Sequence, residues 1–174
     1  NTGRKLMYFD GSGTCTILYD QASNILYRYI SSSKSYKRVS NVIDKLNGSR
    51  YYFYDANGNR RTSSGWKKVN GSTAYYVCDG GYVTSRYTDQ KGTKKVYDFD
   101  YSKNTWVQKK NMWKTVYRSR YYFGSKGVAT MSYNNSTKKA YKFTGRKWKP
   151  AKKLIMKIGN ANYYFNSAAK RVVK

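Results

Sequence analysis

The sequence predicts an all-β fold, a β-hairpin repeat solenoid, because one short aromatic strand motif recurs along the chain between turn residues. The clear copies are Tyr51-Tyr52-Phe53, Tyr75-Tyr76-Val77, Tyr97-Asp98-Phe99, Tyr121-Tyr122-Phe123, Tyr141-Lys142-Phe143 and Tyr163-Tyr164-Phe165. Looser copies lie at Tyr8-Phe9-Asp10 and Tyr27-Arg28-Tyr29, and successive copies are 19 to 25 residues apart. Repeat proteins with this period bury each unit against its neighbours. We therefore expect residues 1–174 to form a single repeat domain of about eight hairpin units.

The first kind of repeat is a pair of short strands joined by a tight turn. One copy runs from Gly65-Trp66-Lys67-Lys68 through Asn70-Gly71 into Ala74–Cys78. Related copies run from Met112–Val116 into Tyr121–Phe123 and from Ile155–Ile158 into Tyr163–Phe165. Asn-Gly pairs favour tight hairpin turns, and they occur at Asn47-Gly48, Asn57-Gly58 and Asn70-Gly71.

The second kind of repeat has a wider turn and ends in an aromatic strand, as in Tyr27–Val39, Tyr97–Lys110 and Tyr141–Pro150. Because side chains alternate along a strand, Tyr97 and Phe99 should share one face. An alternative fold joins two hairpins into a four-stranded blade of about 45 residues, as in a small β-propeller. Two neighbouring repeats of the first kind, at Tyr52 and Tyr76, favour the solenoid. Only Ser40–Leu46 has any helical spacing, and Pro150 indicates a sheet edge or a chain end.

The composition predicts many small aromatic cores rather than one large aliphatic core. The chain has 21 Tyr, and aromatic residues make up 18% of it. Disordered chains are poor in aromatic residues, so the high charge does not indicate disorder here.

The charge predicts a polyanionic partner. Lys and Arg number 35 against eight acidic residues, all of them Asp, which gives a net charge of +27. Self-repulsion of this size destabilises a compact state, so a partner that neutralises it is expected. Teichoic acid, acidic polysaccharide, nucleic acid and an anionic membrane all qualify. Alternatively, the charge only keeps a tyrosine-rich surface soluble.

Catalysis and metal binding have few candidate groups. The chain contains no His and no Glu, which excludes a Ser-His-Asp or Cys-His pair and a Glu general acid. Asp98 and Asp100 share a strand face, but nearby lysines should keep both ionised. Cys15 and Cys78 lie in different repeats, and we expect them to be unpaired thiols. We predict a chain that is not an enzyme and uses no metal or other cofactor.

No apolar run approaches the roughly 20 residues of a membrane span. The chain begins Asn1-Thr2-Gly3 without a secretion signal, which we interpret as the start of an excised or processed segment.

The run from Gly65-Trp66-Lys67-Lys68 to Tyr75-Tyr76 resembles the cell-wall-binding repeats of Gram-positive surface proteins, which include choline-binding and glucan-binding modules. Tyr51–Asn59 and Tyr121–Gly127 resemble the second half of the same repeat. The resemblance implies stacked β-hairpins in a secreted protein held on the bacterial envelope. A weaker resemblance of Val69–Thr84 to the wall-anchoring repeats of lactobacillar S-layer proteins implies attachment to teichoic acid.

The sequence departs from that family where a ligand-caging Trp precedes Tyr-Tyr. Those positions hold Arg50, Ala74, Arg120 and Asn162. Choline is a cation bound by cation–π attraction, so Arg at two of these positions should repel it. An anionic or neutral polymer is the better prediction.

The predicted ligand-binding residues are aromatic side chains and the lysines beside them. They are Trp66, Lys67, Lys68, Tyr75, Trp106, Trp113, Tyr121 and Trp148. The Trp residues either join each hairpin to the next or present their faces to sugar rings. Lysine pairs recur at Lys67-Lys68, Lys94-Lys95, Lys109-Lys110, Lys138-Lys139 and Lys152-Lys153, and could form a basic stripe.

We therefore predict a non-catalytic module of a secreted bacterial protein that binds an anionic wall polymer or glycan outside the cell, at the cell surface or wall. One alternative is a nucleic-acid-binding protein, because a basic surface with interleaved aromatic residues also suits single strands. Another is an adhesin stalk that binds a host protein.

Overall fold

The computed structural model describes residues 4–46 and 50–172 and confirms the all-β prediction. The chain divides into two compact units. Unit 1 is Asn1–Ser85 with Tyr101–Lys103, and unit 2 is Arg86–Asp100 with Asn104–Lys174. The boundary falls inside one strand, between Ser85 and Arg86. That the whole chain forms a single repeat domain stays a prediction.

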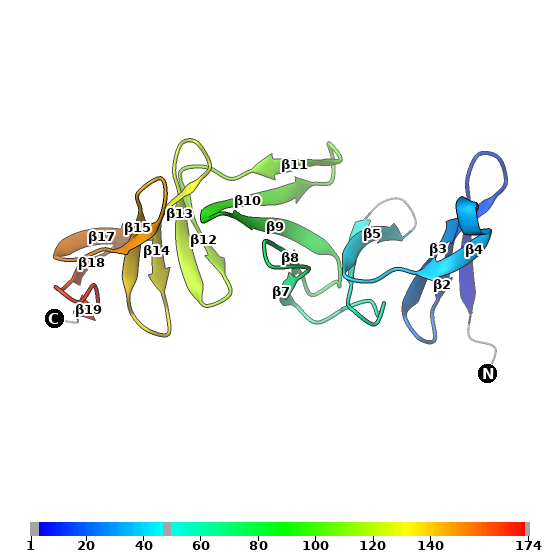
Figure 1. Cartoon of the computed structure of the whole chain (residues 1–174), viewed down its shortest axis with the longest axis horizontal. Coiled ribbons are helices and arrows are strands. Elements are labelled where there is room, and N and C mark those ends of the chain that lie inside the picture. Colours follow the sequence, from blue (N-terminus) through cyan, green and yellow to red (C-terminus); the bar gives the residue numbers. More distant parts are fainter. Residues whose placement is uncertain (1–3, 47–49, 173–174) are drawn as a thin grey trace. The chain divides into compact units, whose positions relative to one another are not determined.

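Unit 1 consists of short antiparallel strands and one 3-10 turn, Ser31–Ser33 (Figure 1). Its strands are β1 (Lys5–Phe9), β2 (Cys15–Asp20), β3 (Ile25–Ile30), β4 (Ser35–Arg38), β5 (Val42–Leu46), β6 (Arg50–Tyr54), β7 (Gly65–Lys68) and β8 (Thr73–Val77). The first four strands form one sheet in chain order, β5 pairs with β6, and β7 pairs with β8.

In unit 2 the hairpins are joined into larger antiparallel sheets. Its strands are β10 (Thr93–Asp100), β11 (Thr105–Gln108), β12 (Met112–Val116), β13 (Ser119–Phe123), β14 (Ala129–Asn134), β15 (Ala140–Phe143), β16 (Trp148–Pro150), β17 (Leu154–Ile158), β18 (Ala161–Phe165) and β19 (Arg171–Val172). Strand β9 (Val83–Gln90) belongs to both units, with β8 and β10 as its neighbours. Strands β12 to β16 form a five-stranded sheet in chain order, and β17 to β19 form a three-stranded sheet.

The two kinds of repeat keep a fixed register. In the first kind, Trp66 faces Tyr76, Trp113 faces Tyr122 and Ile155 faces Tyr164 across the hairpin. In the second kind, Tyr29 faces Tyr36, Phe99 faces Trp106 and Phe143 faces Trp148. The strand alternation expected from the sequence therefore recurs as cross-strand aromatic pairs.

One turn recurs after the aromatic strands and explains part of the spacing between repeats. In each copy the N–H of the first residue donates to the C=O of the fifth, and the N–H of the fourth donates to the C=O of the first. The copies begin at Asp10, Asp55, Cys78, Gly124 and Asn166. Glycine fills the fourth position in all but the last copy because the backbone there has a positive φ, such as 74° at Gly58.

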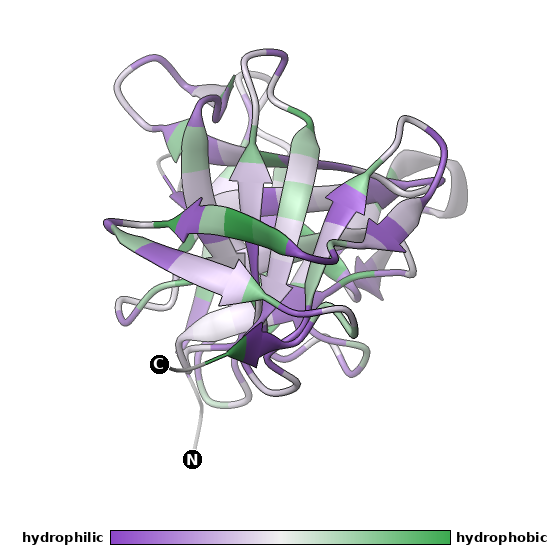
Figure 2. Ribbon diagram, turned by 90° about the vertical axis from the view of Figure 1, so that its left-hand side faces the viewer, coloured by the Kyte–Doolittle hydropathy of each residue, from purple (hydrophilic) through white to green (hydrophobic). Residues whose placement is uncertain are grey.

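Burial is divided among small clusters, as the composition predicted. One cluster in unit 1 centres on Tyr19, Leu26 and Tyr54. One cluster in unit 2 is built from Tyr133, Ala140, Ala151, Met156, Ile158 and Phe165. Figure 2 shows the hydrophobic residues in short stretches of individual strands, separated by hydrophilic ones. Aromatic residues therefore supply much of the buried volume.

Two local predictions have clear outcomes, and a third cannot be assessed. The helical spacing of Ser40–Leu46 was misleading, because Val42–Leu46 is strand β5, paired with β6. Pro150 ends β16, the edge strand of its sheet, where its missing N–H leaves no ladder bond unmade. The turn signal at Asn47-Gly48 lies outside the described residues. Within residues 4–46 and 50–172, no helix has the length and apolar character needed to cross a membrane.

Candidate functional site

Four of the predicted site residues lie on the β7–β8 hairpin of unit 1. Trp66 is half-buried and meets the ring of Tyr76 edge-on, with centroids 5.5 Å apart. On the opposite face of the hairpin Lys67 faces Tyr75, and the Lys67 Nζ donates to Ser63 Oγ at 3.0 Å. Lys68 is exposed at the end of β7. One face therefore carries a Trp–Tyr pair and the other a Lys–Tyr pair.

Trp106 and Trp113 are in unit 2, and each packs against the protein. Trp113 lies 5.5 Å from Tyr122 and packs on the cluster that contains Met156 and Phe165. This position favours the interpretation that Trp113 joins one hairpin to the next. Trp106 meets Phe99 edge-on at 4.9 Å, and the Arg86 guanidinium lies 5.0 Å from its ring.

Tyr121 and Trp148 are brought together in unit 2, with centroids 6.0 Å apart. Tyr87 stacks on Tyr121 at 6.0 Å, and Phe143 lies 5.3 Å from Trp148. The Lys94 ammonium lies over both predicted rings, 6.0 Å from the Tyr121 centroid and 5.7 Å from that of Trp148. We call Tyr87, Lys94, Tyr121, Phe143 and Trp148 the aromatic cluster.

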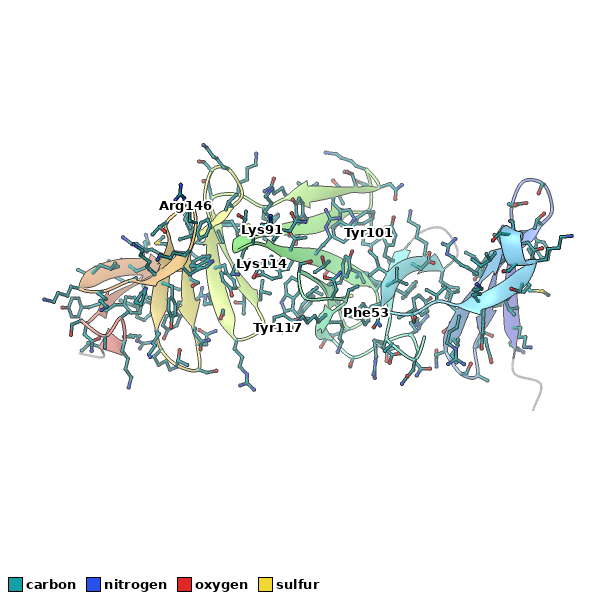
Figure 3. The ribbon with its side chains drawn as sticks, in the orientation of Figure 1. Phe53, Lys91, Tyr101, Lys114, Tyr117 and Arg146 are labelled. Carbon is teal, nitrogen blue, oxygen red and sulfur yellow. The ribbon has the colours of Figure 1, made fainter. Side chains whose placement is uncertain are left out.

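Backbone geometry fixes Trp148 in the aromatic cluster. Its indole N–H donates to the Gly92 carbonyl at 3.1 Å, which ties β16 to the β9–β10 turn. Gly92 has φ 83°, and a Cβ built there would lie 3.6 Å from the Phe143 ring. Figure 3 labels exposed cations on this turn and on the β15–β16 turn, Lys91 and Arg146. The aromatic cluster is therefore accompanied by exposed positive charge.

Electrostatics hold the Lys94 side chain in place. Its ammonium pairs with the Asp89 carboxylate, and its side chain is only 13% exposed. Asp89 also lies beside the Tyr87 hydroxyl. The pKa of Tyr87 is raised, mainly because the phenol is buried and further because Tyr121 and Asp89 are neighbours. Tyr87 stays neutral and acts as a packing partner.

Cations lie over aromatic rings elsewhere in both units. In unit 1, Arg60 lies 4.7 Å from the Tyr52 centroid and Arg50 lies 4.4 Å from that of Tyr82. In unit 2, Arg86 also lies 4.6 Å from the Tyr97 centroid. A cationic ligand at these rings would have to compete with a tethered positive charge. The arrangement agrees with the expectation that choline is not the ligand.

The positive charge is unevenly distributed along the sequence. Residues 101–174 carry 19 Lys and Arg and no Asp or Glu, so all eight carboxylates lie in residues 1–100. Asp98 is shared by Lys114 at 3.0 Å and Lys109 at 3.3 Å. Eight carboxylates cannot neutralise 35 cations, so the surface of unit 2 is strongly positive.

The scarcity of catalytic and metal-binding groups in the sequence extends to their placement. Within the described part of the chain, no group of three or more Asp or Cys side chains is placed to hold a metal ion. Cys15 and Cys78 are free thiols, both half-buried. The Cys15 thiol donates to the Ile17 carbonyl at 3.4 Å.

Sequence reasoning missed the roles of Lys94, Arg86 and Phe143. Lys94 was noticed only as part of a lysine pair, and nothing local links it to Trp148, which is distant in sequence. The cross-strand register offered a signal for Phe143, because Phe99–Trp106 and Phe143–Trp148 are the same pair in successive repeats. Arg86 has no such signal.

No family model and no curated protein matches the chain. Among solved structures, truncated alternansucrase from Leuconostoc mesenteroides is 16% identical with TM-score 0.29, over 95% of this chain and 12% of that one. Choline binding protein F from Streptococcus pneumoniae is 18% identical with TM-score 0.29, over 95% of this chain and 55% of that one. The pneumococcal cell wall endolysin from phage Cp-1, complexed with choline, is 17% identical with TM-score 0.28, over 100% of this chain and 38% of that one.

This chain therefore spans little more than half of these proteins at most, and only a small part of alternansucrase. The resemblance to repeat modules of this kind, first seen in the Gly65–Tyr76 motif, is confirmed. Because all three TM-scores are below 0.5, the function is argued from this chain's own residues.

Proposed function

We propose that this chain is a non-catalytic module that attaches a secreted bacterial protein to the cell wall by binding an anionic envelope polymer or glycan. The observation that carries the proposal is the run from 101 to 174, with 19 cations and no carboxylate. Such an excess attracts any polyanion, speeds encounter with it and makes binding sensitive to salt.

The aromatic cluster supports a polymer made of sugar or polyol units. Tyr121 and Trp148 are half-buried, so part of each ring is available for contact with CH groups. Exposed cations on the neighbouring turns, Lys91 and Arg146, can engage the charged groups of the same polymer. The binding residues proposed from the sequence are Trp66, Lys67, Lys68, Tyr75, Trp106, Trp113, Tyr121 and Trp148. Of these, Tyr121 and Trp148 are the strongest aromatic candidates.

The contacts of the cations argue against a cationic ligand. Lys94 and Arg86 each lie over two rings, and Arg60 lies over Tyr19 and Tyr52. These ring faces are satisfied internally. A ligand that carries negative charge is attracted by the same side chains that would repel choline.

The direct test is sedimentation of the purified full chain with Gram-positive cell walls before and after chemical removal of teichoic acids. We expect the chain to sediment with intact walls at low salt, to lose most binding on stripped walls and to be released by about 0.5 M salt, where the Debye length is only a few ångströms. Single-stranded DNA is included as a competitor.

A second arm separates aromatic recognition from charge. Trp148→Leu removes an aromatic face without changing net charge, and Val107→Leu, at an exposed site, is the matched control. Weaker wall binding by Trp148→Leu alone supports the proposal. Equal binding to intact and stripped walls, or displacement by DNA at a lower concentration than by free teichoic acid, would contradict it.

A further inference from the structure

Three segments of unit 2 that are far apart in sequence bring five cations together. The Arg171 N–H donates to the Lys138 carbonyl at 2.8 Å, and the Ala140 N–H donates to the Ala169 carbonyl at 3.0 Å. These bonds place Lys139 directly opposite Lys170 in an antiparallel bridge. The Asn135 N–H donates to the Arg118 carbonyl at 2.8 Å, which adds the tip of the β12–β13 hairpin. We call Arg118, Lys138, Lys139, Lys170 and Arg171 the basic cluster.

The basic cluster places like charges next to one another without a local carboxylate. Lys138, Lys139, Lys170 and Arg118 are exposed, and like charges directly opposite each other destabilise a strand pair. The carboxylates of unit 2 all precede residue 101, on strands β9 and β10. Asp89 and Asp98 already pair with Lys94, Lys109 and Lys114. An arrangement that costs stability in the free protein is typical of a binding site.

One member of the basic cluster is held rigidly. The Arg171 guanidinium lies 4.5 Å from the centroid of Tyr163, which is itself stacked on Tyr133 at 6.3 Å with an interplanar angle of 11°. Tyr133 belongs to the buried cluster of unit 2. Arg171 is therefore oriented by the core, while the lysines around it remain free to adapt to a ligand.

We propose that the basic cluster binds the phosphate groups of a phosphodiester-linked polyol polymer. This inference rests on the proposed function and specifies both the chemistry and the place of binding. Phosphate offers more acceptor oxygens than a carboxylate, so one group can contact several cations. The repeating charge of the polymer also allows several weak contacts to add.

The basic cluster favours a polyol phosphate over a nucleic acid. Single-stranded nucleic acids are held by aromatic rings on which bases stack. The ring within the basic cluster, Tyr163, already contacts Arg171 and Tyr133. The exposed Tyr164 follows it in β18 and points to the opposite face of the strand. The cluster therefore offers cations without a stacking platform.

The test titrates the full chain with poly(glycerol phosphate) and follows binding by calorimetry at several salt concentrations. The cluster variant combines Lys138→Gln, Lys139→Gln and Lys170→Gln. The matched control combines Lys5→Gln, Lys37→Gln and Lys126→Gln, which are also exposed and remove the same charge. Circular dichroism establishes that all three proteins are folded.

We expect the cluster variant to bind roughly tenfold more weakly than wild type, because each exposed ion pair contributes about a twofold effect. Its plot of log K against log salt should be shallower by about 2, since three phosphate contacts are lost. The control should stay within about twofold of wild type. Equal losses in both variants, or tighter binding of wild type to hyaluronate than to poly(glycerol phosphate), would overturn the proposal.

Two further readouts separate this inference from the proposed function. If wild type sediments with intact walls while the cluster variant does so equally well, the function stands and the placement of the site is wrong. If wild type does not sediment at all, the function itself fails. At low salt without polymer, the cluster variant should also melt about 1–3 °C higher than wild type because repulsion is relieved. A lower melting temperature would mean that the lysines are structural and would overturn the proposal.

Discussion

Replacing Lys94 by Met tests whether the aromatic cluster depends on its internal cation. The Lys94 ammonium contacts the Asp89 carboxylate and lies over the rings of Tyr121 and Trp148. The two ring contacts should contribute about 0.5–1 kcal/mol each. Loss of the partly buried ion pair adds about 1–2 kcal/mol, because Asp89 is left 30% exposed without its partner. Methionine recovers about 0.5–1 kcal/mol by packing on the rings. The net cost should be about 2 kcal/mol.

Urea unfolding followed by Trp fluorescence and by circular dichroism measures this cost. Lys95→Met, on the neighbouring position of β10, is the matched control and should change the unfolding free energy by less than about 0.5 kcal/mol. A double-mutant cycle with Asp89→Asn should give a coupling energy of about 1 kcal/mol. If Lys94→Met is neutral or stabilising and the coupling is zero, the rings do not hold the ammonium and the reasoning fails.

Three further predictions concern the repeats and their cores. Phe123→Ala, at a fully buried site, should cost about 3–5 kcal/mol in urea unfolding, whereas Phe9→Ala, at a site 61% exposed, should cost less than about 1 kcal/mol. Gly58→Ala should cost about 2 kcal/mol or more, because φ is 74° and a Cβ would lie 2.5 Å from Arg38 Cγ, while Gly11→Ala meets nothing within 4 Å and should be nearly neutral; equal costs would refute the turn argument. Burial raises the pKa of Tyr101 to about 12, so an unfolded phenol that ionises near 10 should withdraw stability as pH rises from about 10 to 12. Tyr101→Phe should lessen that loss in urea unfolding at pH 9 and pH 11.5, and an unchanged slope would contradict the shift.

The strands could be predicted because their signals are local. The Tyr-Tyr-Phe motifs, the hairpin turn at Asn70 and the aromatic alternation at Tyr97 and Phe99 depend on neighbours along the chain. Edge placement of Pro150 followed from its missing N–H. The Val42–Leu46 strand was obscured because a few apolar residues fit two periods equally well, and only pairing with β6 decides between them.

The binding surfaces could be predicted only in part, because they depend on contacts between distant segments. Tyr121 and Trp148 were both expected to bind ligand, but their proximity is set by the β9–β10 turn through Gly92. The bridge between Lys139 and Lys170 depends on how β19 returns to the β14–β15 turn. No sequence window contains both residues. Whether the predicted Trp and Lys residues bind ligand stays a prediction.

The pairing of cations with aromatic rings explains how the composition serves both folding and binding. Among residues 4–46 and 50–172, at least six Lys or Arg side chains lie over aromatic rings. A carboxylate partner would stabilise each cation but would also cancel its charge. A tyrosine ring stabilises the cation through its electron-rich face and leaves the net charge unchanged. A chain that must keep a charge of +27 for its partner can therefore order its cations with Tyr and Trp, which accounts for 21 Tyr beside only eight Asp.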